Sequence, residues 1–262
     1  MISLDRRDGR PLRIGHRGAA ALAPENTLAS FRAAIATGVD LIEFDVLRLA
    51  RGELVVAHSY DLYEVSHEAR RGNLRNMHVA EIRASCPELP TLDDALAFFV
   101  DEAPETGVHV DLKSAGAAAD VSAALDRFGL RERTLVSSFH HAALRRLAGL
   151  APRLRLGVSF PRDRLGVHRR RGLGRFVGPG LRGLGTLTPQ LVDLLLSRSR
   201  ASALVLHHAL ASPGAIARAH VRGVPVVAWT VDDPLDLQRV VDAGVDAVVT
   251  NNPSIFVSTL TT

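Results

Sequence analysis

The architecture of this chain follows from the segment GVDLIEFDVLRLARGELVVAH, residues 38–58. Its run of Val, Leu, Ile and Phe predicts a buried strand over 40–47, and a second apolar piece at 53–58 follows after only a short turn. Parallel neighbours need a crossover of about a dozen residues or more, so we expect the second piece to return as an antiparallel hairpin. Inside the strand, Glu43 and Asp45 lie two residues apart and therefore point to one face. Two like charges buried side by side are costly, so something should compensate them.

Further apolar runs alternate with helical segments along the chain, at 12–16, 107–113, 134–139, 153–160, 202–208, 225–231 and 246–251. With the hairpin piece set aside, eight strands alternate with helices, which predicts an α/β fold, the (β/α)8 or TIM barrel. The 262 residues are close to the ~250 typical of that barrel. We therefore expect a single barrel domain over 1–262, with a small polar insert at about 59–90 after the hairpin.

Composition and charge narrow the class of protein. Hydrophobic residues make up 47% and charged residues 23%, as in ordinary globular proteins. The single cysteine, Cys86, excludes an internal disulfide, and neither a leader-like apolar run nor a membrane-spanning run is visible. We therefore expect a cytoplasmic location. The formal charge of +4 favours anionic partners, but the one Trp and two Tyr are too few for base stacking, so nucleic acid is not expected.

One stretch departs from the alternation of strands and helices. Residues 161–185, PRDRLGVHRRRGLGRFVGPGLRGLG, read as a loop with many glycines and seven arginines. In a barrel, loops that follow strands lie on the catalytic face. Such a loop could cover an anionic ligand or contact a membrane surface transiently, and the alternative is a solvated surface loop.

Polar side chains gather at the carboxyl ends of the predicted strands, which meet at one mouth in a barrel. They are His16, Arg17, Glu43, Asp45, His58, Asp111, Lys113 and Trp229. Around them, Glu25 and Asn26 are expected to brace the first loop, and Asn251 and Asn252 to hydrogen-bond at the barrel rim.

The three carboxylates predict a cation site. Glu43, Asp45 and Asp111 converge at the mouth, and oxygen ligands suit one divalent cation, Mg²⁺ or Ca²⁺. Zn²⁺ fits less well because it prefers nitrogen or sulfur ligands and Cys86 lies in the insert. The alternative is that Glu43 and Asp45 form internal salt bridges with Arg17, Lys113 or Arg48.

The other groups suit a phosphodiester. Arg17 can hold a phosphate in bidentate fashion, and Lys113 adds a point charge. His16 and His58 could then act as a general acid–base pair, one activating the attacking oxygen and the other protonating the leaving alcohol.

Motifs over nearly the whole chain resemble, in order and spacing, those of the glycerophosphodiester phosphodiesterases. They are HRG at 16–18, PENT at 24–27, GVDLIEFDV at 38–46, His58, DLK at 111–113, SSF at 137–139, WTV at 229–231 and GVDAVVTNNP at 244–253. The resemblance implies a barrel with a small insert, one divalent cation, and cleavage of glycerophosphodiesters to glycerol 3-phosphate and an alcohol. It also implies a catalytic pair (His16, His58), metal ligands (Glu43, Asp45), phosphate contacts (Arg17, Lys113) and an apolar wall for the glycerol or acyl part (Trp229).

The chain departs from that family at three points. Asp111 stands where family members commonly have Glu, so the metal must shift or be bridged by water. Ser59 stands where the family's Asp follows the histidine, so either Asp61 substitutes as the residue that orients His58 or no residue does. The insert lacks the usual Thr-Gly-rich stretch.

Two other functions stay open at this point. One is phospholipase D-type activity on lysophospholipids through a cyclic phosphate. The other is a non-catalytic protein that binds phosphate or lipid head groups on the same barrel. The sequence makes no prediction of the oligomeric state.

Overall fold

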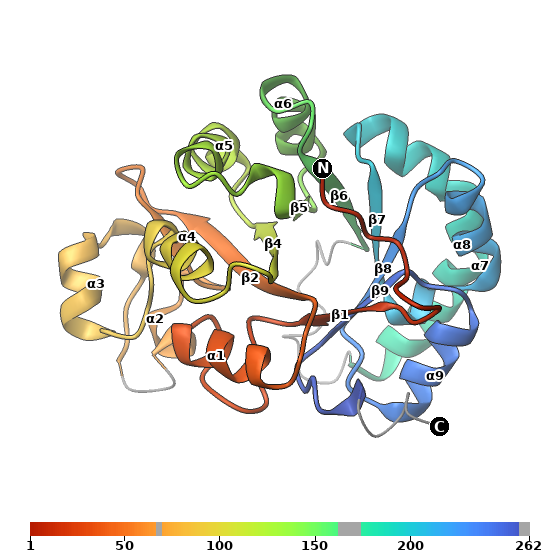
Figure 1. Cartoon of the computed structure of the whole chain (residues 1–262), viewed down its shortest axis with the longest axis horizontal. Coiled ribbons are helices and arrows are strands. Elements are labelled where there is room, and N and C mark those ends of the chain that lie inside the picture. The colour runs from red at the N-terminus through yellow and green to blue at the C-terminus, as the bar shows by residue number, and fades with distance from the viewer. Residues whose placement is uncertain (67–69, 162–173, 257–262) are drawn as a thin grey trace.

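Eight parallel strands close into a barrel. The computed structural model describes residues 1–66, 70–161 and 174–256, and among these the side chains of all but 174–183. The strand order is β1-β9-β8-β7-β6-β5-β4-β2, and pairing of β1 with β2 completes the ring (Figure 1). The strands are β1 (Leu12–Gly15), β2 (Leu41–Arg48), β4 (Gly107–Leu112), β5 (Thr134–Ser138), β6 (Arg155–Phe160), β7 (Ala203–His207), β8 (Val226–Trp229) and β9 (Ala247–Thr250). The prediction of a TIM barrel is confirmed.

The predicted hairpin is confirmed as well. Strand β3 (Leu54–Val56) pairs antiparallel with the end of β2, with Val46 opposite Val56. Between β3 and the next barrel helix, the described residues form the short helices α2 (Leu62–Val65), η1 (Leu74–Asn76) and α3 (Val79–Ser85). They have a small apolar core of their own against the end of β2, built from Leu47, Leu49, Val55, Ala57, Leu62, Leu74, Ile82, Cys86 and Leu89. This segment places polar side chains beside the mouth of the barrel.

Helices surround the barrel on its outer face (Figure 1). They are α1 (Leu28–Ala36), α4 (Leu92–Asp101), α5 (Ala118–Arg127), α6 (His141–Leu150), α7 (Gly174–Ser199), α8 (Pro213–His220) and α9 (Pro234–Asp242), with 3₁₀ turns at η2 (Ala115–Ala117), η3 (Arg131–Arg133) and η5 (His208–Leu210). Thr27 begins α1, since its side chain accepts a hydrogen bond from the Ser30 amide. Thr91 begins α4 in the same way through Asp94.

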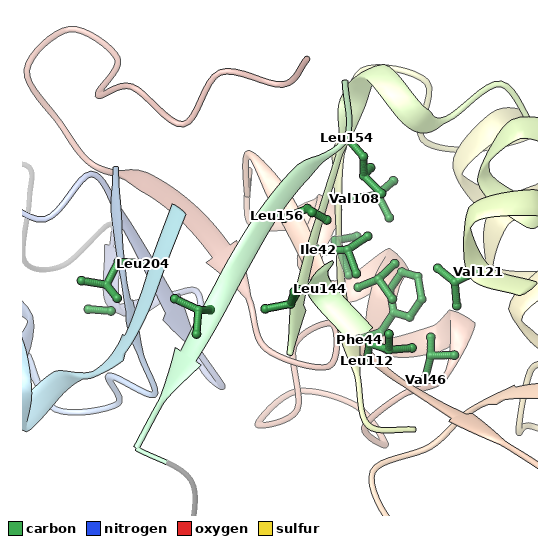
Figure 2. Packing of buried hydrophobic residues seen from close by; sticks show 14 of the residues in the cluster. Ile42, Phe44, Val46, Val108, Leu112, Val121, Leu144, Leu154, Leu156 and Leu204 are labelled. Atoms are coloured by element: carbon green, nitrogen blue, oxygen red, sulfur yellow. The ribbon is translucent and has the colours of Figure 1, made fainter. Parts of the chain in front are cut away.

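The alternation of β2 produces two separate cores. Ile42, Phe44 and Val46 point outward and pack under the helices (Figure 2). Leu41, Glu43 and Asp45 therefore point into the barrel. The interior is apolar around the amino-terminal ends of the strands, where Leu4 also packs, and its members are Leu4, Leu12, Ile14, Leu41, Leu135, Ala203, Val205, Val227, Ala247 and Val249. The inward-facing carboxylates Glu43, Asp45 and Asp111 thus lie toward the carboxyl end of the barrel, beyond this apolar interior.

The prediction of a loop over 161–185 is wrong for residues 174–185, which belong to α7. The glycines suggested a loop, but tertiary packing overrides helix propensity. Val192, Leu195 and Leu196 are buried further along the same helix, which packs against α6 and α8. The rest of the predicted loop, including the arginine run at 169–171, lies outside the described residues. In the part of the chain that is described, no helix is both long and apolar enough to cross a membrane.

An ion-pair network at the base of the barrel leads to a stability prediction. The carboxylate of Asp40, whose side chain is 5% exposed, accepts hydrogen bonds from Arg7, Arg10 and the backbone amide of Arg13. Burial opposes ionisation, but the hydrogen bond from Arg10 and that from the Arg13 amide hold the pKa of Asp40 below its ordinary value. We expect Asp40→Asn to lower the free energy of unfolding by about 1–3 kcal/mol at neutral pH.

The pH dependence has a definite sign. A lowered pKa in the folded state means that the Asp40 contribution is complete above the ordinary aspartate pKa and is lost as pH falls below it. Urea unfolding of both proteins between pH 7 and pH 3 should therefore show a stability difference that shrinks toward the acid end. Asp101→Asn is the control, since Asp101 is exposed. A difference that is constant with pH would contradict the ion-pair explanation.

Candidate active site

Three buried carboxylates meet at the carboxyl end of the barrel. Asp45 on β2 is paired in register with Asp111 on β4, and Glu43 lies one inward-facing position earlier on β2. One carboxylate oxygen from each of the three lies within 4.8 Å of the others. The structure thus brings together the three residues that the sequence predicts as metal ligands.

Two positively charged side chains, Lys113 and Arg17, already lie in this cluster. The ammonium group of Lys113 lies 2.8 Å from Asp45 Oδ1 and donates a hydrogen bond to Asp111 Oδ2. Arg17 Nε lies 3.1 Å from Asp45 Oδ2, and the same guanidinium donates to both oxygens of Glu25. The salt bridges considered as an alternative therefore exist for Asp45. Arg48 takes no part, since it pairs with Asp120.

The charge balance of the cluster fits a divalent cation. With all four ionised, the carboxylates of Glu25, Glu43, Asp45 and Asp111 face the side chains of Arg17 and Lys113, which leaves a formal charge of −2. Burial, together with the charges of Asp45 and Asp111, raises the pKa of Glu43 well above its ordinary value. Lys113 and Arg17, against the effect of burial, hold the pKa of Asp45 below its ordinary value. Oxygen-only ligands with uncompensated negative charge are what Mg²⁺ or Ca²⁺ requires.

The loop after β1 has a strained backbone conformation, and this conformation directs the Arg17 amide toward β2. Arg17 and Asn26 both adopt positive φ, 51° and 59°, which is uncommon outside glycine. Gly18 has φ of 87°, and a Cβ there would lie 2.3 Å from Ser30 Oγ. In this conformation the Arg17 amide donates to Glu43 Oε2 at 2.9 Å. The Asn26 side chain donates to Asp45 and accepts from the Asp45 amide, so the predicted bracing role of Asn26 is confirmed.

His16 is held in one orientation by a chain of hydrogen bonds. Its Nδ1 lies 2.7 Å from Asn251 Oδ1, and the Asn251 amide nitrogen donates to Asp232 at 2.6 Å. A carboxylate can only accept, so the Asn251 amide must present its oxygen to His16, and Nδ1 carries the ring proton. The lone pair of Nε2 then faces the site, 3.8 Å from Glu43 Oε2. Burial, and then the charge of Arg17, lower the pKa of His16 to about 4, so the ring is neutral.

His58 follows β3 and faces the same cluster from the side of the insert. Burial is the main cause that lowers its pKa, and the charges of Asp45, Arg17 and Lys113 act on it too. Beside it is a hollow of about 560 Å³, lined by His58, Ser59, Tyr60, Asp61, Gly72 and Asn73. Asp61 does not orient His58, because its carboxylate accepts from the Tyr63 amide and caps α2.

Trp229 forms part of an aromatic wall at the end of β8. Its ring centroid lies 5.8 Å from that of Phe139 and 5.3 Å from that of His207. The ammonium of Lys113 lies 5.9 Å from the Phe139 ring centroid, so the wall adjoins the cluster. His208 turns away and lies 3.3 Å from Asp236.

Sequence reasoning did not single out four residues that support the site. Asp232 fixes Asn251, Phe139 packs on Trp229, and Ser137 and His109 lie beneath Asp111. A signal existed for three of them, because strand alternation places His109 on the same face as Asp111, and Ser137 belongs to the SSF motif. Phe139 belongs to the same SSF motif, whereas Asp232 lies just after a strand, where polar residues are common, and no pattern marked it.

Comparison with known proteins identifies the family. The model of the glycerophosphoryl diester phosphodiesterase family matches residues 16–255. The chain belongs to this family. It is accordingly a phosphoric diester hydrolase by family.

Relatives in this family cover nearly the whole chain. A glycerophosphodiester phosphodiesterase from Caldanaerobacter subterraneus subsp. tengcongensis is 26% identical over 95% of this chain and 97% of its own length. A probable glycerophosphodiester phosphodiesterase 1 from Mycobacterium tuberculosis is 29% identical over 94% of this chain and 90% of its own. Among solved structures, a putative glycerophosphodiester phosphodiesterase from Galdieria sulphuraria has a TM-score of 0.77 at 21% identity, covering 99% of this chain and 100% of that one. The structural likeness shows the shared barrel.

Proposed function

We propose that this enzyme hydrolyses glycerophosphodiesters to glycerol 3-phosphate and an alcohol, with one divalent cation, Mg²⁺ or Ca²⁺. The observation that carries the proposal is that three buried carboxylates, the positively charged side chains of Arg17 and Lys113, and a neutral histidine meet at one end of the barrel. A related phosphodiesterase from Oleispira antarctica, 22% identical, with a TM-score of 0.71 and covering 96% of this chain and 97% of that one, was solved in complex with the product sn-glycerol-3-phosphate. That product matches the one proposed here.

The proposed chemistry divides the work among residues already placed. Glu43, Asp45 and Asp111 would hold the cation, which when bound supplies positive charge to a phosphoryl oxygen. Arg17 and Lys113 would neutralise the remaining phosphoryl charge as it grows in the transition state. Trp229 would pack against the apolar part of the substrate.

The two histidines take different roles in this scheme. His16 Nε2 presents a lone pair, so His16 would accept the proton of the attacking oxygen as the new P–O bond forms. His58 would donate a proton to the alcohol oxygen as its bond to phosphorus breaks. The anionic substrate favours the protonated form of His58, against the effect of its burial.

Phosphorus NMR of the reaction tests the function directly. We expect glycerophosphocholine to release glycerol 3-phosphate with Mg²⁺ or Ca²⁺, to stop with EDTA, and to resume when the cation is restored. A lysophospholipid substrate run in parallel measures the acyl tolerance. A stable cyclic phosphate would instead indicate the phospholipase D-type reaction by internal attack. Absence of turnover with both substrates and both cations would contradict the proposal.

A further inference from the structure

Both oxygens of Asp111 are occupied by protein donors, and one of the donors is not a charged group. Lys113 donates to Oδ2, and the hydroxyl of Ser137 donates to Oδ1 at 2.9 Å. Ser137 is the register partner of Asp111 on the neighbouring strand β5. Behind Ser137 lies His109, whose Nε2 is 2.9 Å from Ser137 Oγ. These side chains form a buried chain that runs from His109 through Ser137 to Asp111.

The direction of this chain follows from donor and acceptor capacity. An ionised carboxylate only accepts, so the single hydroxyl proton of Ser137 points to Asp111. The contact between His109 and Ser137 then requires His109 to donate from Nε2. Its Nδ1 is buried without a partner in the described structure, which suits a lone pair and not a second N–H. The chain therefore has one consistent proton arrangement, with every N–H and O–H directed toward Asp111.

We propose that Ser137, backed by His109, is the positioning residue that keeps Asp111 available to the cation. Ser137 donates the hydrogen bond that the described structure shows for Oδ1, and without it the Asp111 carboxylate could rotate onto Lys113 so that both oxygens pair with the ammonium. The constraint matters more here because Asp is a short ligand and has little freedom to recover its place. The inference rests on the proposed cation site and adds a residue to it.

The neighbouring residue Ser138 provides a matched control. It is equally buried, but it points to the outer side of β5, where it donates to the Leu112 carbonyl and accepts from the His140 amide. Removing either hydroxyl therefore deletes one buried hydrogen-bonding group on the same strand. Only the loss at Ser137 should reach Asp111.

Calorimetric titration of the purified protein with Mg²⁺ and with Ca²⁺ tests the proposal. We expect Ser137→Ala to weaken cation binding about 10–100-fold, as for other residues that orient metal ligands. Ser138→Ala should stay close to wild type, and Ser137→Thr, which keeps the hydroxyl, should restore binding. Thermal unfolding in EDTA measures how much each change affects the fold alone.

A second pair of variants tests the same chain at His109. His109→Gln keeps an N–H donor and should bind the cation better than His109→Leu, which has none. Equal affinity of Ser137→Ala and wild type, or an equal loss in Ser137→Ala and Ser138→Ala, would overturn the positioning role. Failure of the wild-type protein to bind either cation would overturn the proposed function itself, so the two failures are distinguishable.

Discussion

Replacing His16 by alanine should lower kcat for glycerophosphodiester hydrolysis by about 10²–10⁴-fold. The ring is largely buried, neutral and fixed by Asn251, and its Nε2 lone pair faces Glu43. These features give a base in one orientation, and alanine removes it without adding a charge. Because no ligand of the cluster is changed, cation affinity measured by calorimetry should remain close to wild type.

The comparison variant for this experiment is His220→Ala. His220 is exposed on α8 and lies 2.8 Å from Asp246, away from the cluster. It should keep wild-type kcat, with at most a small loss of stability. If the His16 variant retained more than about a tenth of wild-type kcat, His16 would not be the base. If the His16 variant lost both kcat and cation binding, the substitution would have disrupted the structure of the site.

The barrel was predictable because its signals are local. The apolar strands and the short turn before residue 53 required only periodicity and loop length. The error at 174–185 arose from the opposite situation. Those glycines disfavour a helix locally, and α7 is stabilised by packing on α6 and α8 that no local pattern contains.

The site was predictable to the extent that strand alternation determines it. Glu43, Asp45 and Asp111 point inward by parity, and the closed sheet then places them together. Strand alternation does not determine the distances between these side chains or the positions of their protons. Whether Asp45 pairs with Arg17 and Lys113, and whether Asp61 reaches His58, depends on side-chain geometry at the mouth. Both questions were left open by the sequence.

The second large effect is expected for Asp45→Asn, which should abolish cation-dependent turnover, with a loss in kcat of more than about 10³-fold. Asp45 interacts with more of the site than either of the other two carboxylates. It lies within reach of Lys113 and Arg17 and accepts from Asn26, and its side chain is 1% exposed. The amide would remove the charge and direct an N–H toward one of these donors. Lys113 and Arg17 would lose a buried counter-charge, and we expect a loss of about 3–5 kcal/mol in the free energy of unfolding.

Asp120→Asn separates this effect from a general loss of acidic charge. Asp120 also pairs with an arginine, Arg48, but both side chains are 40% or more exposed, so the change should cost less than about 1 kcal/mol. Urea unfolding with EDTA and with added cation gives the decisive comparison. Added cation should stabilise wild type and Asp120→Asn, because binding to the folded state shifts the equilibrium, and should not stabilise Asp45→Asn. An Asp45→Asn protein that is still stabilised by the cation would place the binding site elsewhere than at this carboxylate cluster.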